Sequence, residues 1–454
     1  MGKLCFPIYD MKKVYNCFVK NKGKECILFN PYSFATVIAP NPNMLDEEEF
    51  ITNISDEDKK FLNENGIFME ERERAYAIGR YFSDMIKYGK TITISDAYSF
   101  SCNMDCIYCF ENGTKEINKS QTKEMRLEEI IKIINLYVDN IEIVDYIFFG
   151  GEPLLNLEYM EYIAKGLVKQ YPQKKIKFSV TSNGTLIDDK FISLCNQFKF
   201  EEIRITMDGP KCVHNARRRL KNGMDSYTII MNNIKKLCDK TNILININTV
   251  IDNQNYNKYN ELYLDINKKI GKYVGCEGTR IVFNVGMLCH PLIDTNYTLK
   301  NGEKNKYGNE KYYNLCLDLI RKGATITSPF YATQCLNSSE KTFIIAPIGD
   351  VYKCITGIGC KRFLLATYEE LQTNANIFYE NNIIQIENSH RAECRNCEYI
   401  AMCNGGCKCQ HYENHDILCR KQILNEEMES LLDLLYEGTF TSEGFFKKRK
   451  EINE

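Results

Sequence analysis

The stretch that decides the fold is Ser101–Glu111, which reads S-C-N-M-D-C-I-Y-C-F-E. It follows an apolar, strand-like run at Thr91–Tyr98 and places Cys102, Cys106 and Cys109 at the spacing C-x3-C-x2-C. Three thiolates on one short loop can converge on one metal centre. An iron–sulfur cube usually takes four protein ligands, so three would leave one iron open for another molecule. Taken alone, the spacing also allows a zinc loop or a chance arrangement.

The composition is that of an ordinary globular protein, with 44% hydrophobic and 26% charged residues. A chain of 454 residues is too long for one small core, so we expect two or three domains. The formal net charge of −2 gives no reason to expect a nucleic-acid or membrane partner. Residues 1–30 lack the regions of a signal peptide, and no apolar run is long enough to span a bilayer. We therefore expect a cytoplasmic protein.

The chain contains 21 cysteines, which a reducing compartment would not use for disulfides. Many of them gather along the sequence, first in the loop quoted above, then at Cys335 and Cys354, and finally between Cys394 and Cys419. Gathered thiols in such a compartment are typical of metal sites. The scattered cysteines are better explained as small buried hydrophobic residues.

From Thr91 onward, strand-like and helix-like segments alternate. Alternating units with buried strands indicate an α/β fold in which helices cover parallel strands. We expect a partial (β/α)6 TIM-like barrel, with functional residues at the C-terminal ends of its strands. The predicted strands are Thr91–Ser95, Tyr146–Phe149, Ile176–Thr181, Ile203–Met207, Ile243–Val250 and Arg280–Val285. The predicted helices are Arg126–Val138, Leu157–Gln170, Asp188–Gln197, Tyr227–Asp239 and Asn257–Ile270.

Further motifs fall at the predicted strand ends. Gly-Gly-Glu-Pro at residues 150–153 closes the second strand, where glycines let the backbone approach a ligand closely and the glutamate adds a charge. Ser182 and Asn183 close the third strand, and Thr206 and Asp208 close the fourth. Turn chemistry explains the last two motifs equally well.

Together these motifs resemble those of the radical S-adenosylmethionine (radical SAM) enzymes, in which an aromatic residue such as Tyr108 precedes the last cysteine. The resemblance implies a [4Fe–4S] cluster on Cys102, Cys106 and Cys109, whose open iron chelates the methionyl amine and carboxylate of SAM. It implies that one electron cleaves SAM and that the resulting 5′-deoxyadenosyl radical removes a hydrogen atom from the substrate. Gly-Gly-Glu-Pro would receive the SAM ammonium, and the next two strand ends would contact the ribose and carboxylate. The residues implied to bind SAM are Tyr108, Gly150, Gly151, Glu152, Ser182, Asn183 and Thr206.

Two features near the fourth strand end allow two interpretations each. Asp208 either holds a turn or touches the substrate. The run Arg217–Arg219 either offers one guanidinium to a carboxylate or lies on a solvated face, and the solvated face is the prediction.

The C-terminal cysteines resemble a second family pattern. The spacing Cys335-x13-Gly349-x4-Cys354, then Cys394-x2-Cys397-x5-Cys403-x3-Cys407 and Cys419, is similar to that of the SPASM domain. A zinc ribbon would need only four thiolates and would not explain the upstream pair. The resemblance implies two auxiliary [4Fe–4S] clusters, which makes three in all. The implied ligands are Cys394, Cys397, Cys403 and Cys419 for the distal cluster and Cys335, Cys354 and Cys407 for the proximal one.

The proximal cluster departs from the family pattern in one respect. Relatives that close it with a fourth cysteine carry that residue shortly before Cys335, whereas Ser328–Thr333 contains none. Either the cluster keeps an open iron, which can bind a substrate thiol, or another cysteine closes it. The candidates for closing it are Cys316, Cys360 and Cys409.

Residues 1–90 are expected to form a separate module. Strand-like runs at Val14–Val19 and Glu25–Phe29, a helix at Ser55–Glu64 and a strand at Ile67–Met69 suggest a winged-helix-like layout. This layout resembles the precursor-peptide recognition domain of some peptide-modifying radical SAM enzymes, and a structural extension on the barrel is the alternative. The partial barrel would span residues 91–325, the SPASM domain 326–425, and a C-terminal helix and tail 426–454. The last helix, at Lys421–Tyr436, is expected to pack on the barrel.

These features predict a radical SAM peptide maturase that forms a thioether or another cross-link in a ribosomally made precursor. Its partners would be that precursor with its leader and an electron donor such as flavodoxin or ferredoxin. A sulfatase-maturating, formylglycine-forming enzyme is the alternative, but such relatives have Asp after the second SPASM cysteine, where this chain has Ile355. A dehydrogenase acting on a small molecule is a third hypothesis. A zinc-binding scaffold is the non-enzyme hypothesis, and it gives the Gly-Gly-Glu-Pro motif no purpose.

Overall fold

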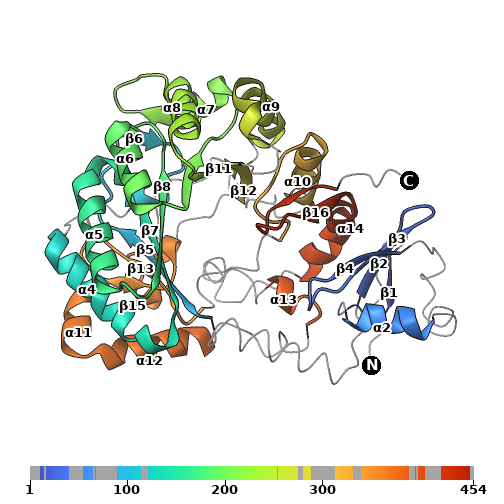
Figure 1. The fold of residues 1–454 in the computed structure, drawn as a ribbon, viewed down its shortest axis with the longest axis horizontal. Coiled ribbons are helices and arrows are strands. Elements are labelled where there is room, and N and C mark those ends of the chain that lie inside the picture. Colours follow the sequence, from blue (N-terminus) through green and yellow to red (C-terminus); the bar gives the residue numbers. More distant parts are fainter. Residues whose placement is uncertain are drawn as a thin grey trace.

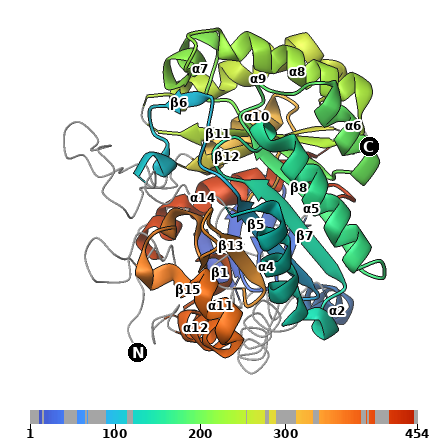
Figure 2. The same ribbon diagram turned by 90° about the vertical axis from the view of Figure 1, so that its left-hand side faces the viewer.

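The computed structural model of the chain is an α/β fold with a large, mainly parallel sheet and a smaller antiparallel sheet (Figures 1 and 2). No helix among the described residues is both long and apolar enough to cross a membrane. The described residues are 11–14, 17–39, 55–64, 67, 89–113, 121–252, 254–274, 280–287, 312–330, 339–387, 394, 397–403 and 421–449.

The large sheet contains a run of parallel strands that pair in the order of the sequence. Every strand predicted from residue 91 onward is present. Because each crossover leads to the neighbouring strand, the connecting helices lie on one face, and the predicted partial barrel is confirmed (Figure 2). The parallel strands are β5 (Thr91–Ala97), β7 (Ile143–Phe149), β8 (Lys175–Ser182), β9 (Glu202–Thr206), β11 (Leu244–Ile251) and β12 (Ile281–Met287).

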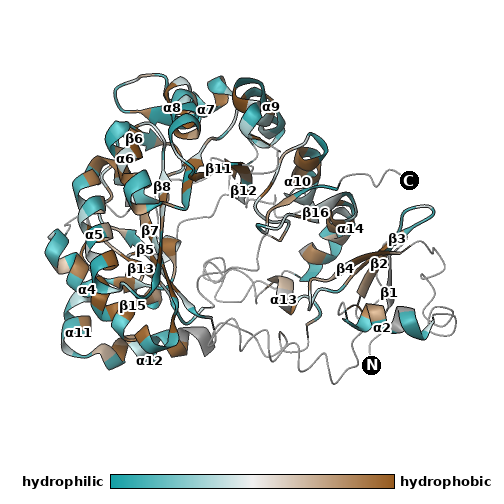
Figure 3. Ribbon diagram, viewed as in Figure 1, coloured by the Kyte–Doolittle hydropathy of each residue, from teal (hydrophilic) through white to brown (hydrophobic). Residues whose placement is uncertain are grey.

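The predicted barrel helices are also present, and they lie along the outer arc of the sheet in Figure 1. Their apolar stripes turn toward the strands (Figure 3). Three of them begin where the sequence supplies a capping side chain, since Thr122, Asp188 and Asp225 each accept a hydrogen bond from a first-turn backbone N–H. The helices are α4 (Lys123–Asn135), α5 (Leu157–Gln170), α6 (Asp189–Phe198), α8 (Ser226–Lys240) and α9 (Tyr259–Ile270).

The main core lies between the parallel strands and these helices. On β7, for example, Tyr146 and Phe148 are buried while the alternating Asp145 and Phe149 are half-buried. Phe148 stacks with Phe178 of β8 at a ring-centroid distance of 6.2 Å. The alternation turns the half-buried side chains of β7 toward the helix-free inner face of the barrel.

The sheet continues past β5 with three strands from the C-terminal part of the chain. β13 (Thr342–Ile345) pairs in parallel with β5, and β14 (Val351–Tyr352) and β15 (Leu364–Ala366) follow antiparallel. Two helices, α11 (Tyr368–Thr373) and α12 (Ala375–Glu387), complete this extension. The sheet therefore crosses the predicted boundary at residues 325/326, and the division into domains stays a prediction.

The N-terminal module is a four-stranded antiparallel sheet followed by a helix. The predicted helix is confirmed, but the single strand predicted at Val14–Val19 is wrong. Val14 ends β1 and pairs antiparallel with Cys17, which begins β2, so that run belongs to two strands. Of the strand predicted at Ile67–Met69, only Ile67 is among the described residues, and it has no strand structure. The elements are β1 (Met11–Val14), β2 (Cys17–Asn21), β3 (Cys26–Phe29), β4 (Thr36–Ala39) and α2 (Asp56–Glu64).

The last helix, α14 (Lys421–Glu437), contacts both this module and the barrel. It packs against α10 (Tyr312–Arg321), as expected for a helix that returns to the barrel, and also against β2 and β3 (Figure 1). Lys20 forms an ion pair with Asp433 at 2.8 Å, and Phe18 stacks on Tyr399 at 5.5 Å. The remaining elements are α13 (Ile400–Cys403), β16 (Gly438–Phe440) and β17 (Phe446–Lys448).

The buried guanidinium of Arg126 connects α4 to β5 and to the residues that follow β13. Arg126 Nη1 lies 3.2 Å from Asp96 Oδ1 on β5, and Nη2 donates to the carbonyls of Ala346 and Pro347 at 2.6 and 2.9 Å. The hydroxyl of Tyr146 donates to Asp96 at 2.5 Å. Arg126, Asp96 and Glu129 are almost completely buried, and Arg126 is the positive partner of both carboxylates, since its Nε lies 4.0 Å from Glu129 Oε2.

Replacing this guanidinium should destabilise the fold severely. Arg126→Met leaves the buried carboxylates of Asp96 and Glu129 without their positive partner, which should lower the free energy of unfolding by roughly 3–5 kcal/mol. Chemical denaturation followed by circular dichroism measures this. Lys132→Met, on the exposed side of the same helix, is the control and should change stability by less than about 0.5 kcal/mol. Equal losses in both variants would contradict the role assigned to Arg126.

Candidate active site

The cysteine loop leaves the C-terminal end of β5 and forms a small ribbon outside the main sheet. Its strand β6 (Met104–Cys106) pairs antiparallel with β10 (Arg218–Leu220), which follows α7 (Lys211–Arg217). The loop then ends in the short 3-10 helix Phe110–Gly113. The predicted position of the loop, at the end of the first barrel strand, is therefore correct.

The three cysteines of the loop pack around one small apolar cluster that includes Met104 and Leu220. Burial raises the pKa of Cys102 to about 11 and that of Cys109 to about 12, and it raises the pKa of Cys106 too. The charge of Cys106 contributes to the shifts of the other two thiols, so the three lie within electrostatic reach of one another.

The donor type of this loop fits an iron–sulfur cluster, because such clusters take thiolates. Within the described part of the chain, no three Cys, His, Asp or Glu side chains are grouped closely enough to hold a metal ion. Cluster binding would therefore draw the three thiols closer together, and it would require their deprotonation.

Gly150 and Gly151 bring the end of β7 against the backbone that leads into the cysteine loop. Both have positive φ, at 83° and 52°. A Cβ on Gly151 would lie 2.2 Å from the carbonyl oxygen of Ser101, and one on Gly150 would lie 2.7 Å from the Cβ of Ala97. The two glycines are thus required by a close contact within the protein, whereas the sequence predicted a close approach to a ligand.

Glu152 is the hydrogen-bond centre of the next two strand ends. Its carboxylate accepts from the hydroxyl of Ser182 at 2.8 Å, from the backbone N–H of Asn183 at 2.7 Å and from that of Leu154 at 3.1 Å. The side chain is buried, and burial raises its pKa while these hydrogen bonds oppose the rise. The structure therefore brings together Glu152, Ser182 and Asn183, as their positions at neighbouring strand ends predicted.

Asn183 also reaches the cysteine loop. Its Nδ2 donates to Asn103 at 2.8 Å and lies 3.8 Å from the sulfur of Cys102. Asn103 in turn donates to the hydroxyl of Thr185 at 2.9 Å. Thr206 is buried at the end of β9, two strands away from Glu152 in the sheet. The strand ends and the cysteine loop thus form one connected surface.

Arg218 is a site residue that the sequence interpretation missed. The prediction of a solvated face is confirmed for Arg219, which is exposed. It is wrong for Arg217, which is buried, and for Arg218, which is half-buried. Arg218 Nη1 donates to the hydroxyl of Tyr108 at 2.7 Å, and the positive charge lowers the pKa of all three loop cysteines against the effect of burial. Among the described residues, its buried Nε has no hydrogen-bond partner.

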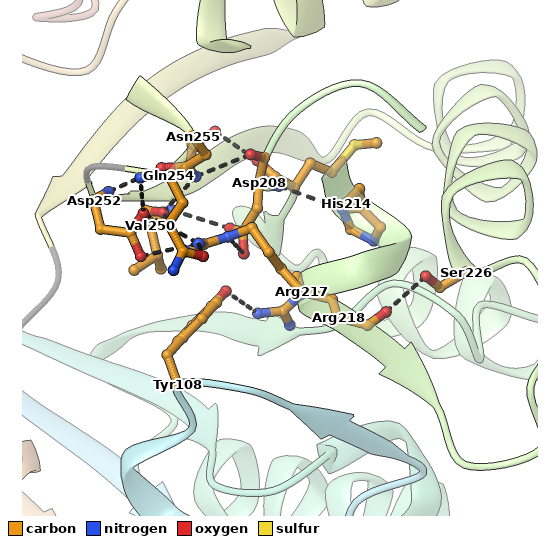
Figure 4. A network of polar contacts seen from close by, with 12 residues as sticks. Tyr108, Asp208, His214, Arg217, Arg218, Ser226, Val250, Asp252, Gln254 and Asn255 are labelled. Carbon is orange, nitrogen blue, oxygen red and sulfur yellow. Dashed lines mark hydrogen bonds and ion pairs between the residues drawn. The ribbon is translucent and has the colours of Figure 1, made fainter. Parts of the chain in front are cut away.

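Arg217 lies in a buried network shown in Figure 4. Its Nη1 contacts both carboxylate oxygens of Asp252 at 2.9 and 3.1 Å, and its Nε donates to Asp208 at 3.3 Å. Its guanidinium carbon lies 5.0 Å from the centre of the Tyr108 ring. Asp208 also accepts from the backbone N–H of Val250 at 3.2 Å, which favours the turn-holding interpretation of this residue.

Glu111, just past the last loop cysteine, was also missed. Its carboxylate accepts from the backbone N–H of Gly151 at 2.8 Å, and burial raises its pKa to about 7. The only signal in the sequence was a charged residue next to the cysteine motif, which does not by itself indicate a partner.

The C-terminal cysteines that the structure describes fall into two places. Cys354 and Phe100, which precedes the cysteine loop, pack against the same apolar cluster beside β13 and β14. Cys397 and Cys403 pack against the main core near α13, and the backbone N–H of Cys397 donates to the carbonyl of Cys394. Cys335, Cys407 and Cys419 lie outside the described residues, so these ligand sets stay predictions.

Two of the candidate closing cysteines can be placed. Cys316 is buried on α10 in the main core, away from the apolar cluster around Cys354. Cys360 packs against the same cluster as Cys354, as does Ile355. Cys409 lies outside the described residues. The structure thus favours Cys360 over Cys316 as a neighbour of Cys354.

Comparison with known sequences supports the motif analysis. The family model "Radical SAM superfamily" matches residues 98–266. The cysteine-type anaerobic sulfatase-maturating enzyme of Clostridium perfringens (strain ATCC 13124) is 25% identical over 336 residues, which cover 68% of this chain and 86% of that enzyme. The enzyme with the same name from Clostridium novyi is 24% identical over 358 residues, which cover 74% and 92%.

Solved structures show the same fold. The structure of anSMEcpe with bound AdoMet matches with a TM-score of 0.57 and 21% identity, covering 76% of this chain and 95% of that one. Streptococcus suis SuiB bound to precursor peptide SuiA matches with a TM-score of 0.53 and 14% identity, covering 89% and 97%. With the family model, the cysteine loop and the partial barrel in agreement, the chain carries a radical SAM domain, which the family model matches over residues 98–266.

Proposed function

We propose that this protein is a radical SAM peptide maturase that forms a thioether or another cross-link in a ribosomally made precursor. The observation that carries the proposal is the convergence of the cysteine loop with Glu152, Asn183 and Arg218 at the C-terminal end of the barrel. An acid, an amide and a guanidinium around one thiol loop are suited to the ammonium and carboxylate of a bound amino acid.

The chain's own residues would bind and orient SAM. Cys102, Cys106 and Cys109 would hold a [4Fe–4S] cluster, which supplies the electron that cleaves SAM. Glu152 would receive the ammonium group. Arg218 would receive the carboxylate through its unpartnered Nε, and Thr206 would lie on the ribose side. The glycines at 150 and 151 would keep the Glu152 turn close to the cysteine loop.

A peptide substrate is supported by two observations. Related solved structures include SuiB bound to the precursor peptide SuiA and anSMEcpe bound to the Kp18Cys peptide. The N-terminal sheet of this chain ends in the edge strands β1 and β4. An edge strand can accept an extended leader by main-chain hydrogen bonds.

The C-terminal region would act as a SPASM domain with two auxiliary clusters, making three [4Fe–4S] clusters in the loaded enzyme. Such clusters would pass on the electron released when the product forms, or bind a substrate thiolate. Cys354 packs on the same apolar cluster as Phe100, which directly precedes the cysteine loop, and this supports a role in electron exchange. The electron donor would be a flavodoxin- or ferredoxin-like protein, and the enzyme would work in the cytoplasm.

Sulfatase maturation is the second candidate function. It is favoured by the names of the curated relatives at 25% and 24% identity. Ile355 argues against it, because an aliphatic side chain in the position of the expected Asp cannot act as a base.

The first prediction concerns the cysteine loop. Changing Cys102, Cys106 and Cys109 together to Ala should abolish the formation of 5′-deoxyadenosine from SAM and remove about one cluster's worth of iron. The other clusters should remain, because their ligands lie in the C-terminal region. Anaerobic iron and sulfide analysis measures this and also tests the zinc-scaffold hypothesis. Continued formation of 5′-deoxyadenosine by the triple variant would refute the assignment.

The second prediction concerns Glu152. Glu152→Gln should weaken SAM binding about 10- to 100-fold, because a charge-assisted bond to the ammonium is lost. Isothermal titration of the cluster-loaded enzyme with SAM measures the affinity. Ser182→Ala is the matched control, because it removes one hydrogen bond to Glu152 and keeps the charge. If both variants weaken SAM binding equally, Glu152 only shapes the turn.

The third prediction concerns the N-terminal sheet. Deleting residues 1–88 should abolish turnover of the leader-bearing precursor and leave peptide-independent SAM cleavage in place. Mass spectrometry of the peptide and quantification of 5′-deoxyadenosine measure the two activities. Because α14 packs on this sheet, a full-length variant with Thr36 and Ile38 changed to Pro keeps the module and blocks the β4 edge. Undiminished turnover by both variants would exclude leader binding at β4.

A further inference from the structure

The cysteine loop is connected to the barrel through the two-stranded ribbon of β6 and β10, and Arg217 is the residue directly before β10. Among the described residues, β6 pairs with β10 alone, and neither belongs to the large sheet. The ribbon continues on both sides, since the N–H of Ile107 donates to the carbonyl of Arg217 at 3.0 Å and the N–H of Lys221 donates to that of Asn103 at 3.0 Å. The position of Cys106, opposite Arg218 in the ribbon, therefore follows the position of β10.

The side chain of Arg217 fixes β10 relative to two barrel strands. Asp208 follows β9 and Asp252 follows β11, and one guanidinium contacts both carboxylates (Figure 4). Its Nη2 also lies 3.4 Å from the carbonyl of Val250 on β11. The planar fork of arginine can satisfy several acceptors at fixed angles, which a lysine cannot do.

The same guanidinium orients the aromatic residue of the cysteine motif. Arg217 lies over the face of Tyr108 with 5.0 Å between its Cζ and the ring centre, while Arg218 donates to the hydroxyl at 2.7 Å. Tyr108 stands between Cys106 and Cys109, so its ring position constrains the backbone that joins two of the thiols. The cation–π contact fixes the plane of the Tyr108 ring, and the hydrogen bond from Arg218 fixes the position of its hydroxyl group.

The energetics favour a positioning role over a stabilising one. Arg217, Asp208 and Asp252 are nearly completely buried. A buried ion triad gains little net stability over apolar side chains of similar size, because desolvation offsets the attraction. It does fix one geometry, since its members lose their partners when they move. The bond between Asp208 and the N–H of Val250 joins β9 to β11 at the same point.

We propose that Arg217 is a positioning residue. Through β10 and Tyr108, it fixes the position of the cysteine loop relative to the strand ends at which SAM would bind. This inference rests on the proposed function, namely that Cys102, Cys106 and Cys109 hold the cluster that binds SAM. In this role Arg217 acts through β10 and Tyr108 and contacts neither the cluster nor SAM.

The experiment uses the full-length, cluster-loaded enzyme and SAM alone, so no peptide substrate is needed. Arg217→Lys should raise the dissociation constant for SAM about 10-fold. It should also weaken the change that SAM causes in the electron paramagnetic resonance spectrum of the reduced cluster. The iron content and the melting temperature report separately on loading and folding. Arg219→Lys, at the exposed neighbouring position, is the matched control and should match the wild type in all four measurements.

A charge-balanced variant separates position from stability. Arg217→Met alone leaves two carboxylates unpaired, whereas Arg217→Met with Asp208→Asn and Asp252→Asn leaves no buried charge in the triad. If the triple variant folds, binds iron and still shows weakened SAM binding and an altered spectrum, the positioning role is supported. Wild-type SAM affinity and spectrum in either the lysine or the triple variant would overturn it. If the cysteine triple variant keeps its SAM-responsive spectrum, the proposed function fails instead, so the two failures are distinguishable.

Discussion

The site depends on the close approach of two backbone segments, the turn after β7 and the chain that leads from β5 into the cysteine loop. Gly150 and Gly151 make the approach possible, since any side chain at Gly151 would overlap the carbonyl of Ser101. The N–H of Glu152 then donates to that carbonyl at 2.9 Å. With its backbone fixed, the Glu152 carboxylate is buried beside β8, where it accepts hydrogen bonds from Ser182 and Asn183. The position of the cysteine loop relative to the strand ends thus depends on one steric requirement, the absence of a side chain at Gly151.

The barrel could be predicted from the sequence because its signals are local and repeated. Apolar strands alternate with amphipathic helices from Thr91 to Val285, and several helices begin at side chains that cap them, such as Asp188 and Asp225. Residues at strand ends could be grouped for the same reason, because parallel strands bring their C-terminal ends to one edge. The error at Val14–Val19 shows the limit, since a run of strand-forming residues does not reveal that Val14 and Cys17 belong to two different, paired strands.

The arginine pair could not be predicted, because its role depends on long-range contacts. Arg218 meets Tyr108 across 110 residues of sequence, and Arg217 meets Asp252 across 35. The contact of Arg218 with Tyr108 depends on the pairing of β6 with β10, and strands this short carry no readable periodicity. The contact of Arg217 with Asp252 joins the end of α7 to the end of β11. A run of three arginines ordinarily indicates a solvated surface, and here only Arg219 has that environment. The sequence identified the cysteine loop but not the ribbon that holds it.

The charges around the loop distinguish Arg217, which is buried, from Arg218, which is half-buried. Arg217 is balanced by Asp208 and Asp252, whereas in the described part of the chain Arg218 has the neutral hydroxyl of Tyr108 as its side-chain partner. Burial and the nearby Arg218 lower the pKa of His214 to about 3, so this histidine stays neutral and adds no second cation. Arg217 is therefore outnumbered by two carboxylates, whereas the charge of Arg218 acts on the three loop thiols and on Glu152, whose pKa values it lowers. A carboxylate bound at the Nε of Arg218 would gain a charge-assisted hydrogen bond.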